Sequence, residues 1–351
     1  MSNLLITGGT GSLGNAIIDN LIGNYGNYDN GVFDKIIVYS RDEQKQELMK
    51  NKYNSHPQLR FLIGDVRDKE RLNLAVKGVK FIVHAAAMKI VPSVEYNPIE
   101  CIKTNIIGTQ NLIEVTQNVY GVEKVLFIST DKAVNPINLY GATKLAAEKL
   151  IIAANHISGI NGPKYSVARY GNVANSNGSV IPFFMKQIDE GKPLSITHKD
   201  MTRFWITLPQ AANFVINRLH NMIGNEIFIP DMQSFRVMDL VNILNSNTRP
   251  HFGGINYKII GIRPGEKIHE DLISHHELPY VDDTLEYFII SDTVNEKNYK
   301  FIENYYTEGG KPKSYNSSSA LMDYETLQCR LADAGFIENV KSNTISCNFG
   351  L

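Results

Sequence analysis

The sequence predicts an α/β fold: a doubly wound parallel sheet followed by a smaller second domain. Short apolar, strand-like runs alternate with helix-like stretches through the first half of the chain, and this alternation is typical of a parallel sheet covered by helices. The runs lie near residues 3–7, 35–39, 59–63, 80–84, 124–129 and 165–169. A glycine-rich turn follows the first run, and the regular alternation ends at about residue 171.

The glycine turn predicts a dinucleotide site of the Rossmann type. Gly8, Gly11 and Gly14 stand between the first strand-like run and an apolar-periodic stretch. Glycines in this context permit a tight turn, close approach of a pyrophosphate to backbone amides, and close packing of helix on strand. A plain turn is the alternative reading. We expect the cofactor to contact Thr7, Gly8, Gly11, Ser12, Leu13 and Gly14.

The second strand favours NADP over NAD. It ends in Ser40-Arg41, at the position where NAD enzymes commonly have a carboxylate for the ribose 2′-hydroxyl. A guanidinium there can bind a 2′-phosphate, although Arg41 also fits as a solvated residue that opens the charged helix 42–52. The third and fourth strands place Asp65 and Val66 near the adenine, and leave room for the cofactor at the small residues Ala85 and Ala86.

The Tyr140 segment carries the residues expected to do chemistry. A helix from Tyr140 onward places Lys144 on the same face, because residues four apart are neighbours on a helix. A cation beside the phenol favours the phenolate, which is otherwise scarce because tyrosine has a pKa of about 10. A core aromatic and a solvated lysine are the alternative reading. Thr130, Asp131 and Lys132 precede this helix and follow a buried strand.

The composition is that of a soluble enzyme of the cytoplasm. The chain has 351 residues, of which 43% are hydrophobic and 20% charged, and its net charge is −1. We therefore expect neither nucleic acid nor a membrane as partner. The three cysteines are far apart with no metal-like spacing, so we expect no metal site. Because the first strand begins at about residue 3, we expect no signal peptide.

We expect three parts in the chain. Residues 1–171 form the NADP-binding domain, completed by about residues 203–222. Residues 172–290, where prolines separate shorter elements, form the substrate domain. Residues 291–351 are a polar C-terminal extension with an amphipathic helix near 323–335, and residues 23–31 are an enlarged loop.

The motifs resemble those of the extended short-chain dehydrogenases/reductases and, more narrowly, of the inverting UDP-N-acetylglucosamine 4,6-dehydratases. The resemblance covers roughly residues 3–290. Its segments are Ser129-Thr130-Asp131-Lys132-Ala133, Asn135-Pro136-Ile137-Asn138-Leu139-Tyr140-Gly141, Arg169-Tyr170-Gly171-Asn172-Val173, Gly178-Ser179-Val180-Ile181-Pro182 and Met201-Thr202-Arg203-Phe204. It implies UDP-N-acetylglucosamine as substrate, UDP-2-acetamido-2,6-dideoxy-β-L-arabino-hexos-4-ulose as product, and a tightly bound NADP that is recycled.

The chemistry assigns roles to the catalytic residues. Tyr140 takes the proton of the carbon-4 hydroxyl, and Thr130 hydrogen-bonds the same oxygen. The resulting ketone acidifies the proton on carbon 5, which Lys132 removes while Asp131 protonates the departing carbon-6 hydroxyl. Lys132 is the discriminating position, since retaining dehydratases usually have Glu there.

Further residues are expected to hold the substrate. Lys89 lies near the cofactor and is a second candidate base. Arg203 and Arg263 are candidates for the two phosphates, because a guanidinium can bind phosphate oxygens bidentately. Asn172 is a candidate for the pyrophosphate or the sugar amide, and Glu266 lies close to Arg263 in the same segment. Structural ion pairs or turns are the alternative for each.

Other functions stay open. A 4-epimerase needs Tyr140 and Lys144 but no acid and base for elimination, and a retaining dehydratase differs in product stereochemistry. A non-catalytic NADP-binding sensor is expected to lack one of these two residues. The resemblance also implies a homo-oligomer, dimer or higher, that pairs through the Tyr140 helix and the helix near 99–119.

Overall fold

The computed structural model describes residues 2–22, 33–174, 179–247, 257–283, 287–291 and 314–337. The expected loop 23–31, Gly178 and most of the expected extension 291–351 lie outside these residues. The strands of the main sheet are β1 (Asn3–Thr7), β2 (Lys35–Ser40), β3 (Leu59–Ile63), β4 (Phe81–His84), β5 (Lys124–Thr130), β6 (Lys164–Tyr170), β9 (Ile227–Pro230), β13 (Val281–Asp283) and β14 (Tyr287–Ile290). The predicted α/β fold and its first six strands are confirmed.

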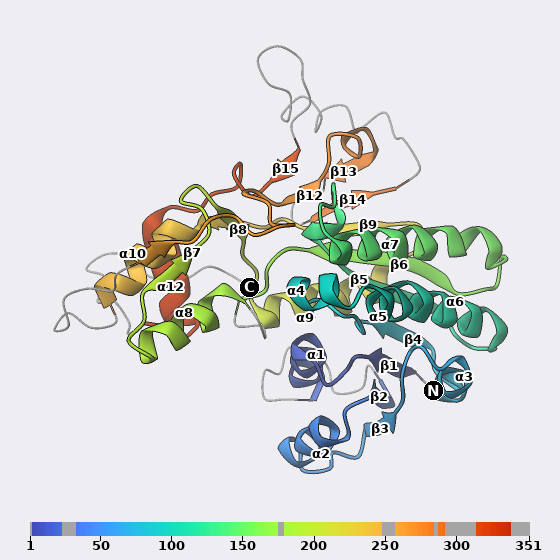
Figure 1. The fold of residues 1–351 in the computed structure, drawn as a ribbon. Coiled ribbons are helices and arrows are strands. Elements are labelled where there is room, and N and C mark those ends of the chain that lie inside the picture. The colour runs from blue at the N-terminus through green and yellow to red at the C-terminus, as the bar shows by residue number, and fades with distance from the viewer. Residues whose placement is uncertain are drawn as a thin grey trace. The chain divides into compact units, whose positions relative to one another are not determined.

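The helices connect these strands (Figure 1). They are α1 (Ser12–Ile22), α2 (Glu43–Lys52), α3 (Lys69–Val76), α4 (Val91–Tyr96), α5 (Pro98–Ile102), α6 (Gly108–Asn118), α7 (Leu139–Ile157), α8 (Val180–Asp189), α9 (Leu208–Asn221), α10 (Val237–Asn247) and α12 (Tyr324–Asp333). Short turns of helix are η1 (Lys103–Ile107), η2 (Asp131–Ala133) and η3 (Leu278–Tyr280). The helix predicted near 99–119 is thus interrupted by η1, a π-helical turn.

The main sheet has nine strands in the order β13-β14-β9-β6-β5-β4-β1-β2-β3. The strands from β9 to β3 pair in parallel, and β14 and β13 add to the β9 edge antiparallel. The chain leaves β1 for β2 on one side, whereas β4 pairs on the other, so the order reverses between β1 and β4. In open α/β sheets, ligands bind at the carboxyl ends of the strands beside such a reversal.

Local sequence explains where helices start. Asp42 accepts a hydrogen bond from the Lys45 amide and caps α2, and Asn138 accepts one from the Gly141 amide and caps α7. Asp and Asn are favoured at this position because they satisfy amides that lack a partner in the helix. α1 packs on α9, and α3 and α7 both pack on α6, which gives the sheet its two helical layers.

The chain forms two compact units. The first comprises Met1–Gly171, Thr207–Asp231 and Asp271–Tyr315, and the second comprises Asn172–Ile206, Met232–Glu270 and Asn316–Leu351. This corrects the expected boundaries, which assigned residues 271–290 to the substrate domain. These residues lie in the first unit because β13 and β14 extend its sheet.

The second unit has its own core. It contains β7 (Leu194–Ile196), β8 (Thr202–Phe204), β10 (Ser234–Arg236) and β11 (Tyr257–Ile259). Apolar side chains of α8, α10 and α12 form one buried cluster that includes Trp205. Two short strands, β12 (Asp271–Ile273) and β15 (Tyr315–Asn316), pair with each other. Across the described residues, no helix combines the length and apolarity that crossing a membrane requires.

Candidate active site

The predicted cofactor residues of the first unit lie along one edge of the sheet. Thr7 ends β1, Ser40 ends β2, Asp65 and Val66 follow β3, and Ala85 and Ala86 follow β4. These strands are parallel neighbours, so their carboxyl ends meet at the same edge. Thr130 ends β5, the next strand along, and brings the predicted catalytic segment to this edge as well.

The glycine turn is packed so closely that side chains are excluded. Gly8 has φ of +67°, and a Cβ there would lie 2.8 Å from the Ala86 backbone. A Cβ at Gly14 would lie 2.1 Å from the carbonyl oxygen of Gly9. At Gly11 the nearest atom to a Cβ is the Gly8 carbonyl at 3.2 Å. The turn therefore needs glycine at the first and third positions, and its geometry fits a dinucleotide pyrophosphate at the start of α1.

A buried hydrogen-bond chain joins β1, β4 and α6. Thr109 Oγ1 donates to the Asn105 carbonyl, so it accepts from His84 Nε2 at 3.1 Å. His84 Nδ1 then accepts from Thr7 Oγ1 at 2.7 Å, and the Ala86 amide donates to that hydroxyl at 3.3 Å. Burial lowers the pKa of His84 to about 3, so the imidazole is neutral. These hydrogen bonds fix the carboxyl ends of β1 and β4, where the cofactor is expected to bind.

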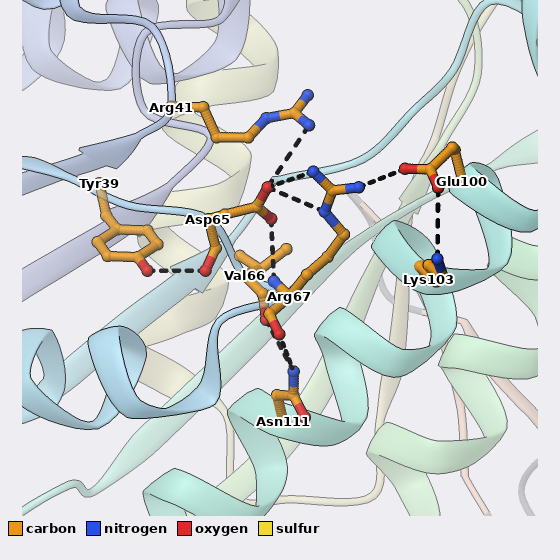
Figure 2. A network of polar contacts seen from close by, with 8 residues as sticks. All are labelled: Tyr39, Arg41, Asp65, Val66, Arg67, Glu100, Lys103 and Asn111. Atoms are coloured by element: carbon orange, nitrogen blue, oxygen red, sulfur yellow. Dashed lines mark hydrogen bonds and ion pairs between the residues drawn. The ribbon is translucent and has the colours of Figure 1, made fainter.

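Asp65 is the centre of an ionic cluster (Figure 2). Arg67 donates to one carboxylate oxygen through Nη2 and Nε, at 2.7 and 2.9 Å, and also pairs with Glu100. Arg41 lies 3.7 Å from the same oxygen, and its side chain is 57% exposed. Burial would raise the pKa of Asp65, but the hydrogen bonds and charge of Arg67 outweigh it and hold the pKa below its ordinary value. Arg67 thus neutralises Asp65 and leaves most of the Arg41 guanidinium available to a ligand.

Side-chain amides hold Ser40 and Val66 in place. Gln46 Nε2 donates to the Ser40 carbonyl and hydroxyl at 3.1 and 3.0 Å. Asn111 Nδ2 donates to the Val66 carbonyl at 3.0 Å, while the Val66 side chain packs on Gly108. Arg67 was not predicted from the sequence. It follows Asp65 by two residues, and an arginine so close to a carboxylate at the end of a strand is the signal that would have identified it.

The start of α7 lies against η2, and Gly141 makes this approach possible. A Cβ at Gly141 would lie 2.1 Å from the Lys132 carbonyl oxygen and 3.1 Å from Pro136 Cβ. The helix that carries Tyr140 therefore packs directly on the turn that carries Asp131 and Lys132. Sequence reasoning quoted Gly141 in a motif but gave it no role.

The predicted acid and base meet in η2. Asp131 Oδ1 accepts from Thr130 Oγ1 at 2.8 Å and from Lys132 Nζ at 3.1 Å. The Asp131 side chain is 1% exposed, whereas that of Lys132 is 21% exposed. The carboxylate is thus held inside, and the ammonium reaches toward solvent from the same cluster. An isolated buried charge is costly, so the pair is the arrangement that burial favours.

Tyr140 is buried beside this cluster. Burial raises its pKa to about 12, while the Lys132 charge and a hydrogen bond with Thr130 lower it. The sequence predicted Lys144 as the cation that favours the phenolate, but the groups that lower this pKa are Lys132 and Thr130. The phenol packs with Val94 and Cys101 in a small apolar cluster.

Lys144 lies deeper. Its ammonium donates to the Ile128 carbonyl at 2.6 Å and lies 3.9 Å from the centre of the Phe127 ring. Burial lowers its pKa to about 7, although the carboxylate of Glu148 raises it. The i, i+4 spacing thus places Lys144 on the buried face of α7, under the sheet edge.

Asn105, in the π-helical turn η1, was not identified from the sequence. Its Oδ1 accepts from the Met88 amide at 2.8 Å, and its Nδ2 donates to the Met88 carbonyl and to Thr143 Oγ1, both at 3.0 Å. It therefore ties the loop after β4 to α7. That loop carries Lys89, which is exposed. π-Helical turns are frequent at functional sites.

The remaining predicted residues lie in the second unit. Arg203 is 8% exposed, donates to the Thr202 and Ile268 carbonyls, and lies 3.5 Å from Glu266 Oε1. Glu266 Oε2 accepts from the Arg263 amide at 3.2 Å, while the Arg263 residue is exposed. The structure thus brings Arg203, Arg263 and Glu266 together. The Asn172 carbonyl accepts from the Ile206 amide at 3.2 Å, and its buried Oδ1 has no partner among the described residues.

Comparisons with known proteins identify relatives along most of the chain. The profile of a family described as polysaccharide biosynthesis protein matches residues 4–292. A UDP-N-acetylglucosamine 4,6-dehydratase (inverting) from Campylobacter jejuni is 49% identical over 88% of this chain and 89% of its own length. A UDP-glucose 4-epimerase from Rickettsia rickettsii is 39% identical over 88% and 87%. The X-ray structure of Pen from Bacillus thuringiensis has a TM-score of 0.84 and 34% identity, and covers 95% of this chain and 97% of its own.

Proposed function

The chain belongs to the polysaccharide biosynthesis protein family, and we propose that it is a UDP-N-acetylglucosamine 4,6-dehydratase that inverts carbon 5. The cluster of Asp131, Lys132 and Tyr140 carries this proposal. It combines a carboxyl group, an amine and a phenol within one hydrogen-bonded and packed group. An epimerase has no use for the first two. The Campylobacter relative, whose name states this activity, supports the proposal at 49% identity.

Tyr140 begins the reaction. Its phenolate accepts the proton of the carbon-4 hydroxyl as that carbon is oxidised, and Thr130 hydrogen-bonds the same oxygen. The Lys132 charge favours the phenolate, although burial raises the pKa of Tyr140 to about 12 and the Asp131 charge also raises it. The 4-ketone that forms acidifies the proton on carbon 5.

Lys132 and Asp131 then remove water. Lys132 as a neutral amine takes the carbon-5 proton, and Asp131 as a neutral acid gives its proton to the departing carbon-6 hydroxyl. This neutral pair holds the same number of protons as the ion pair, and the 3.1 Å hydrogen bond is the path between the two forms. The cluster therefore needs no proton from solvent to become active.

The cofactor proposed here is NADP. A bound nicotinamide would accept the hydride from carbon 4 and give it back to carbon 6, while carbon 5 takes up a solvent-exchangeable proton on the face opposite to the one deprotonated. Gly8, Gly11 and Gly14 would hold the pyrophosphate at the start of α1, and Lys144, whose pKa burial lowers to about 7, would lie at the nicotinamide end of the site. Arg41 binds the 2′-phosphate, which the neutralisation of Asp65 by Arg67 supports.

The second unit holds the UDP group. Arg263 is exposed next to Glu266, so its guanidinium is available for phosphate oxygens. Asn172 offers a buried amide oxygen that has no partner among the described residues. Arg203 positions Glu266 and adds a second cation. We also propose that Lys89 contacts the substrate.

The test is NMR of the product formed from UDP-N-acetylglucosamine in deuterated water, with no cofactor added. We expect a 4-keto-6-deoxy sugar of L-arabino configuration with deuterium at carbon 5. The D-xylo configuration would contradict inversion, a 4-epimer would establish an epimerase, and absence of conversion by the folded, cofactor-loaded protein would contradict catalysis. A cytoplasmic location stays a prediction. Self-association through α6 and α7 is also a prediction, and light scattering would measure it.

A further inference from the structure

A buried ion network lies behind the catalytic helix, and none of the steps above uses it. Arg169 on β6 is 1% exposed, and its guanidinium donates through Nε and Nη2 to the two carboxylate oxygens of Glu148, at 3.0 and 2.7 Å. It also donates to both oxygens of Glu277, at 3.1 and 2.9 Å, and to the Leu272 carbonyl at 3.0 Å. These bonds occupy all the donors of a guanidinium.

The network joins segments that are far apart in the sequence. Glu148 lies on α7, Arg169 on the neighbouring strand β6, and Glu277 follows β12. Glu277 is itself held by the amide and hydroxyl of Ser274, at 2.9 and 3.0 Å. Removal of one partner from such a buried pair leaves an uncompensated charge, so the geometry of the three residues is tightly specified.

The network has an excess of negative charge. Burial would raise the pKa of Glu277, but Arg169 outweighs it and lowers the pKa below its ordinary value. Burial would lower the pKa of Arg169, but Glu148 and Glu277 raise it. Two carboxylates, those of Glu148 and Glu277, pair with one guanidinium, which leaves one negative charge in excess.

Lys144 is placed to balance that charge. It precedes Glu148 by one turn of α7, and both side chains are buried. The other groups that act on Lys144 carry no full charge: Cys101 is a thiol whose pKa burial raises, and His84 is neutral because burial lowers its pKa to about 3. Its remaining contacts are the Ile128 carbonyl and the Phe127 ring.

We propose that Glu148, Arg169 and Glu277 form a positioning network that favours the protonated form of the Lys144 side chain at the cofactor edge of the sheet. Glu148 supplies the negative charge, and Arg169 and Glu277 hold its carboxylate in place. Without this charge, burial would favour the neutral amine. This inference deepens the proposed function. Its turnover measurement rests on that function, whereas its NMR titration does not.

The test measures the ionisation of Lys144 directly. In the full-length, cofactor-loaded protein with lysine labelled with ¹³C at Cε, the NMR signal absent from Lys144→Met reports its titration. Glu148→Gln keeps the shape of the side chain and one acceptor for Arg169 but removes the charge. We expect the titration midpoint of Lys144 to fall by about one pH unit. Glu123→Gln, which removes a carboxylate from a surface pair with Lys80, should leave it unchanged.

Glu277→Gln gives a second test, because the Glu277 side chain is 22% exposed and the change is easier to accommodate. The midpoint should fall in the same direction by a smaller amount. An unchanged midpoint in folded Glu148→Gln, or an equal fall in Glu123→Gln, would overturn the proposal, and a fall confined to Glu148→Gln would remove Glu277 from it. If Glu148→Gln does not fold, Glu277→Gln decides alone.

Turnover provides the second readout. If the dehydratase needs charged Lys144, the loss of activity at alkaline pH should move to lower pH by the same amount as the NMR midpoint in each variant. A midpoint that falls while the activity profile stays fixed would show that the network controls Lys144 without affecting catalysis, which overturns its positioning role. The NMR titration needs no substrate, so its result stands even if the proposed reaction is wrong.

Discussion

Gly141→Ala should separate the catalytic helix from the turn on which it packs. The added Cβ would lie 2.1 Å from the Lys132 carbonyl oxygen, which belongs to the backbone and has no rotamer to change. Non-bonded heavy atoms rest at about 3.5 Å, so the start of α7 and η2 must move apart by roughly 1.4 Å. Pro136 Cβ, at 3.1 Å, restricts movement on the other side.

This displacement acts on the proposed chemistry and on stability at once. It moves Tyr140 away from Lys132 and Thr130, the two groups that lower its pKa. A misplacement of about 1 Å can reduce a rate by about 100-fold, and overpacking typically costs about 1–3 kcal/mol of unfolding free energy. We therefore expect kcat to fall by roughly two orders of magnitude while the nucleotide turn around Gly8 is unaffected.

The assay compares kcat for UDP-N-acetylglucosamine, the bound cofactor and the unfolding free energy. Ala142→Ser is the matched control, because Ala142 is the next residue of α7 and is exposed. It should leave all three quantities close to those of the unchanged protein. A Gly141→Ala protein with unaltered kcat and stability would show that α7 does not need this contact, and would refute the reasoning.

Three further predictions concern single residues. Lys132→Ala should abolish water loss and leave cofactor binding intact, as measured by product NMR and the absorbance of bound nucleotide; full turnover would contradict its assigned role. Arg41→Ser should weaken NADP binding by about 10- to 100-fold and leave NAD binding unchanged in calorimetry, since a hydrogen bond to a charged group contributes about 1.5–3 kcal/mol. His84 has a pKa lowered from 6.5 to about 3, so the unfolded chain takes up a proton below pH 6.5 that the folded chain refuses. Its contribution to stability is present above pH 6.5 and should fall by about 1.4 kcal/mol per pH unit as the pH drops toward 3, a slope that urea unfolding should find reduced in His84→Gln.

Local patterns were sufficient to predict the sheet edge. The first six strands and the glycine turn were predictable because each is signalled within about ten residues by alternation, glycine spacing or a flanking helix. The Tyr140 helix was predictable for the same reason. The parallel order then brings Thr7, Asp65 and Thr130 to one edge without further information.

Contacts between distant segments were not predictable in this way. The pairing of Arg169 with Glu277 depends on the fold of residues 271–290. The prolines that separate the shorter elements after residue 172 gave no sign that β14 would pair with β9. Gly141 shows the same limit. Position 141 requires glycine because the Lys132 carbonyl oxygen lies so close to it, and its place in the helix gives no sign of this contact. The cation that acts on Tyr140 was misassigned because helical spacing gives the face of Lys144 but not the depth to which its ammonium reaches.

That reassignment links the two halves of the proposed reaction. Oxidation at carbon 4 benefits from a charged Lys132, because the charge favours the Tyr140 phenolate. Elimination needs the same residue as a neutral amine. Both conditions are met by one proton that moves along the hydrogen bond between Lys132 and Asp131, charged before oxidation and neutral after it. When Tyr140 has taken the substrate proton, the Lys132 charge no longer stabilises a phenolate, so the ion pair loses part of its advantage and the active neutral pair becomes accessible. Lys144, whose charged form a separate network favours, takes no part in this exchange.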